Sequence, residues 1–179
     1  MTDAVPAQIV LADAEATKQL GVDLARLLRA GDLVVLVGDL GAGKTTLTQG
    51  IGAGLEVRGQ VASPTFIIAR SHRSTIGGPD LIHVDAYRIG SLDEIDALDL
   101  DATLAQAVTV VEWGQGWVEQ LAEDWLEIRL SRPRGAHTGD ADIRVAQIRA
   151  QGPRWAGVTF PSTPPHPTPP HPTADQPLR

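Results

Sequence analysis

The segment GDLGAGKT at residues 38–45 constrains the fold of this chain more than any other feature. It matches the pattern G-x-x-x-x-G-K-[ST] at every fixed position. Five apolar residues, 33–37, come directly before it and predict a strand buried on both faces, because turn signals bound them. The residues from Lys44 to the glycines at 52 and 54 predict a helix. A strand, a glycine-rich loop and a helix in this order predict a phosphate-binding loop, called the P-loop below.

The residue types of the P-loop each suit the binding of a magnesium-nucleoside triphosphate. Glycines let backbone N–H groups approach phosphate oxygens, and the N-terminus of the following helix adds a favourable partial charge. Lys44 is expected to bridge the β- and γ-phosphates, and the Thr45 hydroxyl is expected to ligate Mg²⁺. The nucleotide-binding residues predicted from the loop are Asp39, Leu40, Gly41, Ala42, Gly43, Lys44, Thr45 and Thr46.

The base of the nucleotide is inferred from a missing motif. GTPases of the P-loop class read guanine with an Asn/Thr-Lys-x-Asp sequence late in the domain. This chain has no asparagine, and its Thr17-Lys18 pair precedes the P-loop and lacks the aspartate. ATP is therefore the better candidate ligand.

Two acidic residues each end an apolar run: Asp85 follows residues 81–84, and Glu112 follows residues 108–111. A P-loop site needs an acid at the end of a neighbouring strand to hold the metal ion or its water. Either residue could instead cap the next turn. The residues alone leave Asp85 and Glu112 as equal candidates for the metal ligand, with the other acting as a base or as a partner of the ligand.

The segment SPTF, residues 63–66, lies between the P-loop and Asp85. Its proline stiffens the backbone and places the Thr65 hydroxyl beside a strand start. We interpret it as a switch in which Thr65 senses the γ-phosphate and the metal; a simple turn is the alternative. Trp113 either stacks on a ligand or packs in the core. His83, inside a predicted strand, is expected to be a packed histidine rather than a ligand.

The rest of the chain predicts an α/β fold: a three-layer P-loop NTPase-like domain with a mixed central sheet flanked by helices. Further expected elements are a helix from Asp13 to Gly31, a hairpin of strands 66–71 and 81–85, an acidic helix at 92–98, and strands at 108–111, 125–130 and 143–148. Residues 1–150 are assigned to the P-loop domain. Residues 151–179 are assigned to a proline-rich, disordered tail, because its PPHPT repeats cannot bury a core.

Composition limits the classes of partner. The chain of 179 residues has a formal net charge of -7 and a pI of about 5.1, which argues against a broad surface for nucleic acid. It has no cysteine, so disulfides and thiolate chemistry are excluded. No apolar run approaches the roughly 20 residues that span a bilayer. We expect a cytoplasmic protein without a membrane partner.

The motifs GDLGAGKTTL, SPTF, HVDAYRI and VVEWG, in this order and spacing, resemble the TsaE family, formerly YjeE. This family contains the ATPase of bacterial tRNA threonylcarbamoyladenosine synthesis. The resemblance covers about residues 8 to 150. Phe66 and Val84 stand where the family often has tyrosine and phenylalanine, and neither change touches a proposed polar contact.

The resemblance implies roles for individual residues and for partners. Lys44 would bind phosphate, Thr45 and Glu112 would hold magnesium, and Asp85 and Thr65 would complete the hydrolytic site. Trp113 would lie beside that site, and Asp13 would help to form the adenine pocket. The implied partners are the TsaD and TsaB proteins, with tRNA contacted only indirectly through their complex.

Two other functions fit a P-loop. A small-molecule kinase would use Asp85 as the base for an acceptor hydroxyl, but the only short insertion, residues 90–103, is acidic and lacks the arginines of a lid. A nucleotide sensor would bind without turnover even with its partners present. ATP hydrolysis is the favoured interpretation.

Overall fold

The fold is given by a computed structural model that describes residues 7–64, 69–88, 105–116, 122–133 and 142–162. The strands are β1 (Ala7–Leu11), β2 (Leu33–Val37), β3 (Ala69–His72), β4 (Asp80–Asp85), β5 (Ala107–Glu112), β6 (Trp125–Ser131) and β7 (Arg144–Gln151). The helices are α1 (Ala14–Ala25) and α2 (Lys44–Gly54), with short 3₁₀ turns η1 (Ala86–Arg88) and η3 (Pro153–Trp155). The expected acidic helix at 92–98 and the first residues of the expected strand 66–71 lie outside the described residues.

A single mixed sheet organises the described residues, with strand order β1-β7-β6-β2-β5-β4-β3. Strand β2 lies between β5 and β6 and is parallel to both, and β4 is parallel to β5. The β3–β4 pair is antiparallel, which confirms the predicted hairpin. In the register of β4 and β5, Asp85 is directly opposite Glu112. Parallel strands therefore carry both predicted acids to the same edge of the sheet.

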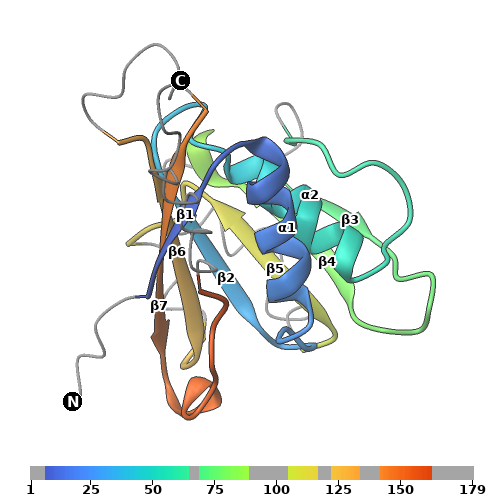
Figure 1. Cartoon of the computed structure of the whole chain (residues 1–179). Helices are drawn as coiled ribbons and strands as arrows, with labels where there is room; N and C mark the ends of the chain where they lie inside the picture. Colours follow the sequence, from blue (N-terminus) through green and yellow to red (C-terminus); the bar gives the residue numbers. More distant parts are fainter. Residues whose placement is uncertain (1–6, 65–68, 89–104, 117–121, 134–141, 163–179) are drawn as a thin grey trace, which may run out of the picture.

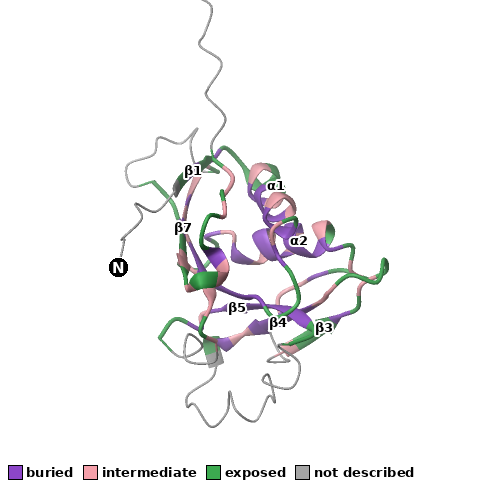
Figure 2. Ribbon diagram, turned by 90° about the horizontal axis from the view of Figure 1, so that it is seen from below, coloured by how far each residue is buried: buried purple, intermediate pink, exposed green. Residues whose placement is uncertain are grey.

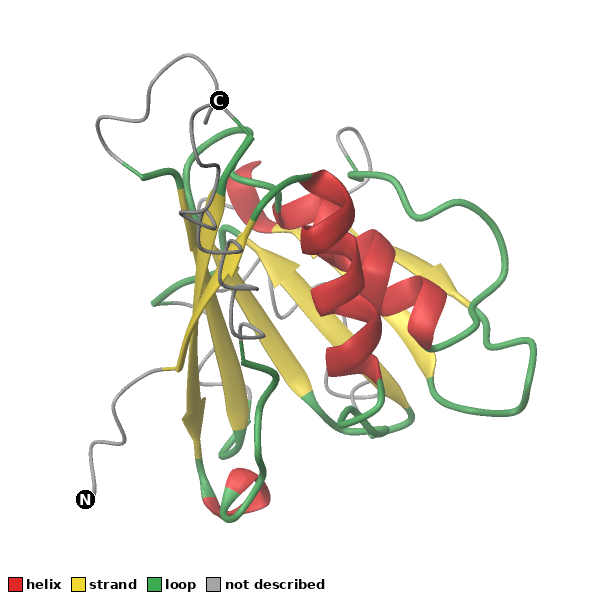
Figure 3. Cartoon of the chain, in the orientation of Figure 1, coloured by secondary structure: helices red, strands yellow, loops and turns green. Residues whose placement is uncertain are grey.

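The central strand β2 has apolar residues throughout because both of its faces are buried. Val34 and Leu36 join the core cluster that includes the apolar residues of α1 and α2. Leu33 and Val35 join a second cluster on the opposite face. Both described helices lie side by side on one face of the sheet (Figure 1, Figure 3), and Figure 2 shows buried residues along β5 and on the sides of both helices. The α/β fold with a mixed sheet is thus confirmed.

Glycines bring α1 and α2 into close contact. A Cβ atom on Gly21 would lie 2.4 Å from the Leu47 carbonyl oxygen, and one on Gly50 would lie 2.0 Å from the Lys18 carbonyl oxygen. Glycine inside a helix costs roughly 0.5–1 kcal/mol relative to alanine, so both positions trade intrinsic helix stability for a short distance between the helices. This packing fixes α1 beside the helix that follows the P-loop.

Helix α1 begins as predicted, with the Asp13 carboxylate accepting a 2.7 Å hydrogen bond from the Ala16 N–H. It ends at Ala25 rather than continuing to Gly31. The Leu27 N–H bonds the Leu24 carbonyl at 2.8 Å, which tightens the last turn into a 3₁₀ geometry. The chain then turns toward β2, so the prediction of the helix end was wrong.

The folded domain continues past the boundary predicted at residue 150. Strand β7 ends at Gln151, and Trp155 of η3 is only 4% exposed within the core. Phe160 packs against the same cluster. The boundary at 150 is therefore too early, because an aromatic anchor follows it. Residues 163–179, with the proline repeats, lie outside the described residues. Strand β1, which pairs with β7, was not predicted.

Candidate active site

The P-loop connects the end of β2 to the start of α2. Gly43 caps α2 with a φ of 106°, a left-handed conformation that favours glycine. Gly38 has no room for a side chain, because a Cβ atom would lie 2.4 Å from the Leu130 carbonyl oxygen on β6. These positions explain two of the fixed glycines of the motif. The N–H groups of the first turn of α2 remain available to an anion.

Lys44 is buried at the centre of the loop, with 5% of its surface exposed. Its Nζ donates hydrogen bonds to the Gly38 carbonyl at 2.7 Å and the Asp39 carbonyl at 3.1 Å, and it lies 3.8 Å from the centre of the Trp113 ring. Burial lowers the pKa of Lys44, while the charges of Glu112, Asp85 and Asp39 act in the opposite direction. The ammonium is thus held by the loop and lies within the field of the surrounding acids.

A hydrogen-bonded chain joins the start of α2 to the ends of β5 and β4. The Thr45 hydroxyl donates to Glu112 Oε1 at 3.0 Å, and His83 Nε2 lies 2.9 Å from the same oxygen. Glu112 is 3% exposed and His83 is fully buried. The structure therefore brings Thr45 into direct contact with Glu112, the acid that the family resemblance implied, whereas the residues alone left Glu112 and Asp85 as equal candidates.

Asp85 contacts the predicted switch segment instead. Its Oδ2 accepts a 3.3 Å hydrogen bond from the Ser63 hydroxyl, and its Oδ1 accepts one of 3.1 Å from the Tyr87 N–H. Asp85 is partly exposed, unlike Glu112. The two acids lie side by side but have different neighbours. Thr65, the predicted sensor, lies outside the described residues.

Trp113 lies beside the P-loop and is half-buried. Its ring contacts the Lys44 ammonium and also meets Tyr87 edge to face, with the ring centres 5.3 Å apart. Tyr87 is 71% exposed. Trp113 has a φ of 62°, unusual for a residue with a side chain, so the backbone turns sharply after Glu112. Trp113 is therefore part of the site wall and does not belong to either core cluster of the described residues.

The start of α1 borders the P-loop. A Cβ atom on Gly43 would lie 3.5 Å from Thr17 Cγ2, so the first turns of α1 lie against the loop. Asp13 itself is exposed, and its Oδ1 is used in the N-cap of α1. A role for Asp13 in an adenine pocket stays a prediction, because its described contacts are those of a helix cap.

Two arginines that the sequence analysis did not predict contact the P-loop. Arg132, after β6, donates from Nη2 to the Gly41 carbonyl at 2.9 Å, and Arg144 of β7 reaches the same oxygen at 3.5 Å. Neither residue belongs to a motif. The pairing of β6 with β2 brings Arg132 to the loop, and the pairing of β7 with β6 brings Arg144 there, so no local sequence pattern identifies them.

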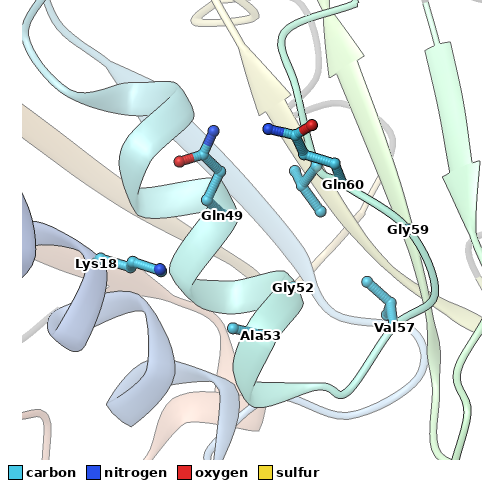
Figure 4. A pocket seen from close by; sticks show the side chains of 8 residues that line it. Lys18, Gln49, Gly52, Ala53, Val57, Gly59 and Gln60 are labelled. Carbon is cyan, nitrogen blue, oxygen red and sulfur yellow. The ribbon is translucent and has the colours of Figure 1, made fainter.

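A separate cavity of about 250 Å³ lies between α2 and the segment that leads toward Ser63. Figure 4 shows Lys18 of α1 and Gln49 of α2 beside it, with Gln60 across from Gln49. None of the predicted site residues lines this cavity. The candidate active site is the group around Lys44 and Glu112, not this cavity.

Among the described residues, no three His, Cys, Asp or Glu side chains gather closely enough to enclose a metal ion. Magnesium at P-loops takes most of its oxygen ligands from phosphate and water, so such a cluster is not needed. None of the helices in the described ranges is long and apolar enough to cross a membrane.

The fold and the loop between β2 and α2 place the chain in the α/β class of P-loop NTPase-like domains. The family model described as threonylcarbamoyl adenosine biosynthesis protein TsaE matches residues 11–138. The chain belongs to the TsaE family, which acts in tRNA threonylcarbamoyladenosine biosynthesis.

Individual relatives agree with this assignment. The tRNA threonylcarbamoyladenosine biosynthesis protein TsaE of Streptomyces coelicolor is 58% identical over 140 residues, which cover 78% of this chain and 93% of that protein. The protein of the same name from Bacillus subtilis is 40% identical over 142 residues, covering 79% and 84%. The crystal structure of Bacillus subtilis YdiB superposes with a TM-score of 0.65 at 31% identity, covering 86% of this chain and 93% of that chain.

Proposed function

We propose that this protein is a P-loop ATPase that binds and hydrolyses Mg-ATP. Hydrolysis supports a TsaD–TsaB complex in forming N6-threonylcarbamoyladenosine in tRNAs that read codons starting with adenine. In the proposed reaction water attacks the γ-phosphorus, the bond to the β–γ bridging oxygen breaks, and ADP and inorganic phosphate are released. The activity and these partners go beyond what family membership establishes.

The observation that carries the proposal is the 3.0 Å hydrogen bond between the Thr45 hydroxyl and Glu112. It places a loop hydroxyl and a strand-end carboxylate around one point, and oxygen ligands of this kind suit Mg²⁺. Glu112 is 3% exposed, and no described lysine or arginine forms an ion pair with it. A buried carboxylate without such a partner is unfavourable, so a bound cation would offset that cost. Bound magnesium would supply charge neutralisation at the phosphates.

Lys44 and Trp113 would act on the phosphates and on water. An ammonium has three N–H donors, and two of those of Lys44 are directed at loop carbonyls. The remaining donor, or all three after a change of rotamer, can contact the β- and γ-phosphates. Trp113 covers one side of the ammonium and would keep water from it.

Asp85 and the switch segment are proposed to act on the attacking water. Asp85 lies opposite Glu112 in the sheet, and Ser63 ties it to the segment that leads to Thr65. We assign Asp85 as the group that orients or deprotonates water, and Thr65 as the residue that completes the site when the triphosphate is bound.

The partner assignment rests on the family resemblance, and the names of relatives support only the biosynthetic process. A protein 58% identical to this chain is named for tRNA threonylcarbamoyladenosine biosynthesis. The chain itself has a net charge of -7, so direct and strong binding of tRNA is not expected. An accessory ATPase that acts through protein partners fits this charge.

The test combines binding and turnover. Isothermal titration calorimetry with ATP, ADP and GTP, with and without Mg²⁺, should give binding of adenine nucleotides that tightens with Mg²⁺. Hydrolysis of ATP should be slow alone and strongly stimulated by the TsaD–TsaB pair. Binding without turnover in the presence of both partners would favour a sensor, and phosphate transfer to a small acceptor would favour a kinase.

A further inference from the structure

His83 is a fully buried imidazole directly behind the candidate active site. It lies in β4 between apolar residues and is 0% exposed. Burying a polar ring is unfavourable unless it is hydrogen bonded. The imidazole therefore needs a partner whose interaction offsets the cost of its burial.

Strand register places His83 beneath the acidic pair. His83 is opposite Val110, and Asp85 is opposite Glu112, two residues further along each strand. Side chains two residues apart on a strand share a face. Leu81 and Val110 belong to the core cluster beneath α1 and α2. His83, Asp85 and Glu112 therefore lie on the face from which α2 presents Thr45.

The hydrogen bonds of His83 are one-sided. Its Nε2 is 2.9 Å from Glu112 Oε1, whereas Nδ1 is buried without a hydrogen-bond partner among the described residues. An ionised carboxylate only accepts hydrogen bonds, so the ring proton is assigned to Nε2, which donates to Glu112. The hydrogen bond to Glu112 is thus the interaction that offsets the cost of burying this ring.

Two donors converge on a single oxygen of Glu112. Oε1 accepts from both the Thr45 hydroxyl and the His83 ring. Among the described residues, no group donates a hydrogen bond to Oε2. Two hydrogen bonds from different directions hold the carboxylate in one rotamer and leave Oε2 free for a cation.

We propose that His83 is a positioning residue that orients Glu112 so that Oε2 faces the magnesium of the bound nucleotide. This inference rests on the proposed function, because it requires a magnesium-nucleotide site at Glu112. Donors that orient a metal-binding carboxylate typically change metal affinity about 10- to 100-fold when they are removed. The role of His83 is then to couple magnesium to nucleotide binding, without touching the nucleotide.

The experiment compares two substitutions of His83 in the full chain. His83→Gln keeps an N–H donor near the position of Nε2, and His83→Leu removes the donor while keeping much of the volume. The measured quantity is the ratio of the ADP dissociation constants without and with Mg²⁺, from calorimetry. We expect His83→Leu to reduce this ratio about 10-fold, with metal-free ADP binding unchanged because the P-loop is intact. His83→Gln should stay near wild type.

Thr109→Val is the matched control. Thr109 lies on neighbouring β5, is fully buried, and its Oγ1 has no hydrogen-bond partner among the described residues. Thr109→Val removes a buried hydroxyl that does not contact Glu112. The ratio of the ADP dissociation constants without and with Mg²⁺ should therefore not change. If His83→Leu does not fold, His83→Asn serves instead, because its shorter amide does not reach Glu112.

Three outcomes would overturn the inference. If folded His83→Leu or His83→Asn has the wild-type ratio of ADP dissociation constants without and with Mg²⁺, the hydrogen bond from His83 is not needed for magnesium binding. If His83→Gln and His83→Leu reduce this ratio equally, the effect comes from the shape of the ring and not from its hydrogen bond. If Mg²⁺ does not tighten ADP binding by the wild-type protein, the proposed magnesium site itself is wrong. If Mg²⁺ tightens ADP binding by the wild-type protein and by the His83 variants equally, only the role of His83 is wrong.

Discussion

Two buried carboxylates at opposite ends of neighbouring strands have different surroundings. Asp32, just before β2, is 4% exposed, and Glu112, at the end of β5, is 3% exposed. Asp32 receives two hydrogen bonds from the Arg154 guanidinium, at 3.0 and 2.8 Å, and one of 2.8 Å from the Arg29 N–H. Among the described residues, Glu112 receives hydrogen bonds from only a hydroxyl and an imidazole. One carboxylate is fully charge-paired, and the other is not.

This difference separates a structural acid from a functional one. An Arg–carboxylate pair with two hydrogen bonds satisfies the charge within the protein, and a second cation would gain little there. Glu112 is buried as deeply as Asp32 but has no guanidinium partner among the described residues, so its charge remains available to a ligand. Burial alone therefore does not identify a functional carboxylate; the lack of a guanidinium partner among the described residues is what distinguishes Glu112 from Asp32.

The largest effect is expected at the structural acid. Arg154→Ala leaves Asp32 buried and unpaired and removes the 2.7 Å hydrogen bond from Arg154 to the Leu27 carbonyl. Breaking a buried pair in this way costs about 3–5 kcal/mol of the free energy of unfolding. Urea unfolding followed by circular dichroism measures it.

The control for Arg154→Ala is an exposed pair. Arg26 contacts Asp23 at 3.0 Å, with side chains 72% and 34% exposed. Arg26→Ala should change the free energy of unfolding by less than about 1 kcal/mol. Equal losses for the two arginine variants would contradict the view that Arg154 compensates a buried charge.

Lys44→Ala is expected to act on turnover instead of stability. The substitution removes the cation at the β- and γ-phosphates, and Lys18, the other lysine of the chain, lies beside a different cavity. Removing one such electrostatic contact typically lowers kcat about 100-fold or more. ATP hydrolysis with the TsaD–TsaB pair present measures it. Turnover near wild type would contradict the assignment of the P-loop as the catalytic site.

Local sequence predicted the parts of the site that depend on chain neighbours. The strand, loop and helix around Lys44 follow one another directly, so their order determines their placement. The meeting of Asp85 and Glu112 was also predictable, because both acids end apolar runs and parallel strands end at a common edge. The α/β class follows from the same alternation of strands and helices.

Contacts between distant segments were not predictable from local patterns. The choice of Glu112 over Asp85 as the neighbour of Thr45 depends on how α2 lies over β5. The contact of Arg132 with the P-loop requires β6 to lie beside β2. The Asp32–Arg154 pair joins residues 122 positions apart, so no local pattern indicated this contact at the end of the domain.

Glu112 and Asp85 should differ in their dependence on magnesium. Glu112→Gln keeps the shape but removes a ligand charge, so the half-saturating magnesium concentration for hydrolysis should rise about 10-fold. Asp85→Asn should lower kcat with a smaller change in that concentration, because it acts on the attacking water. Magnesium titrations of hydrolysis, with partner proteins present, distinguish them. The reverse pattern would assign the metal to Asp85 and the water to Glu112.

The smallest effect on stability is expected from deleting the proline-rich end of the chain, in contrast to the large effect of losing Arg154. Deleting residues 163–179 removes a segment rich in proline but leaves Trp155, Phe160 and the Asp32–Arg154 pair intact. Nucleotide binding and the melting temperature should stay close to those of the full chain, because such a segment buries little apolar area. Deleting residues 152–179 instead removes Arg154 and the buried Trp155 ring, and should lower the melting temperature by many degrees. Differential scanning calorimetry of the two truncations measures this difference, and a large loss on the shorter deletion would show that the proline-rich segment docks on the domain.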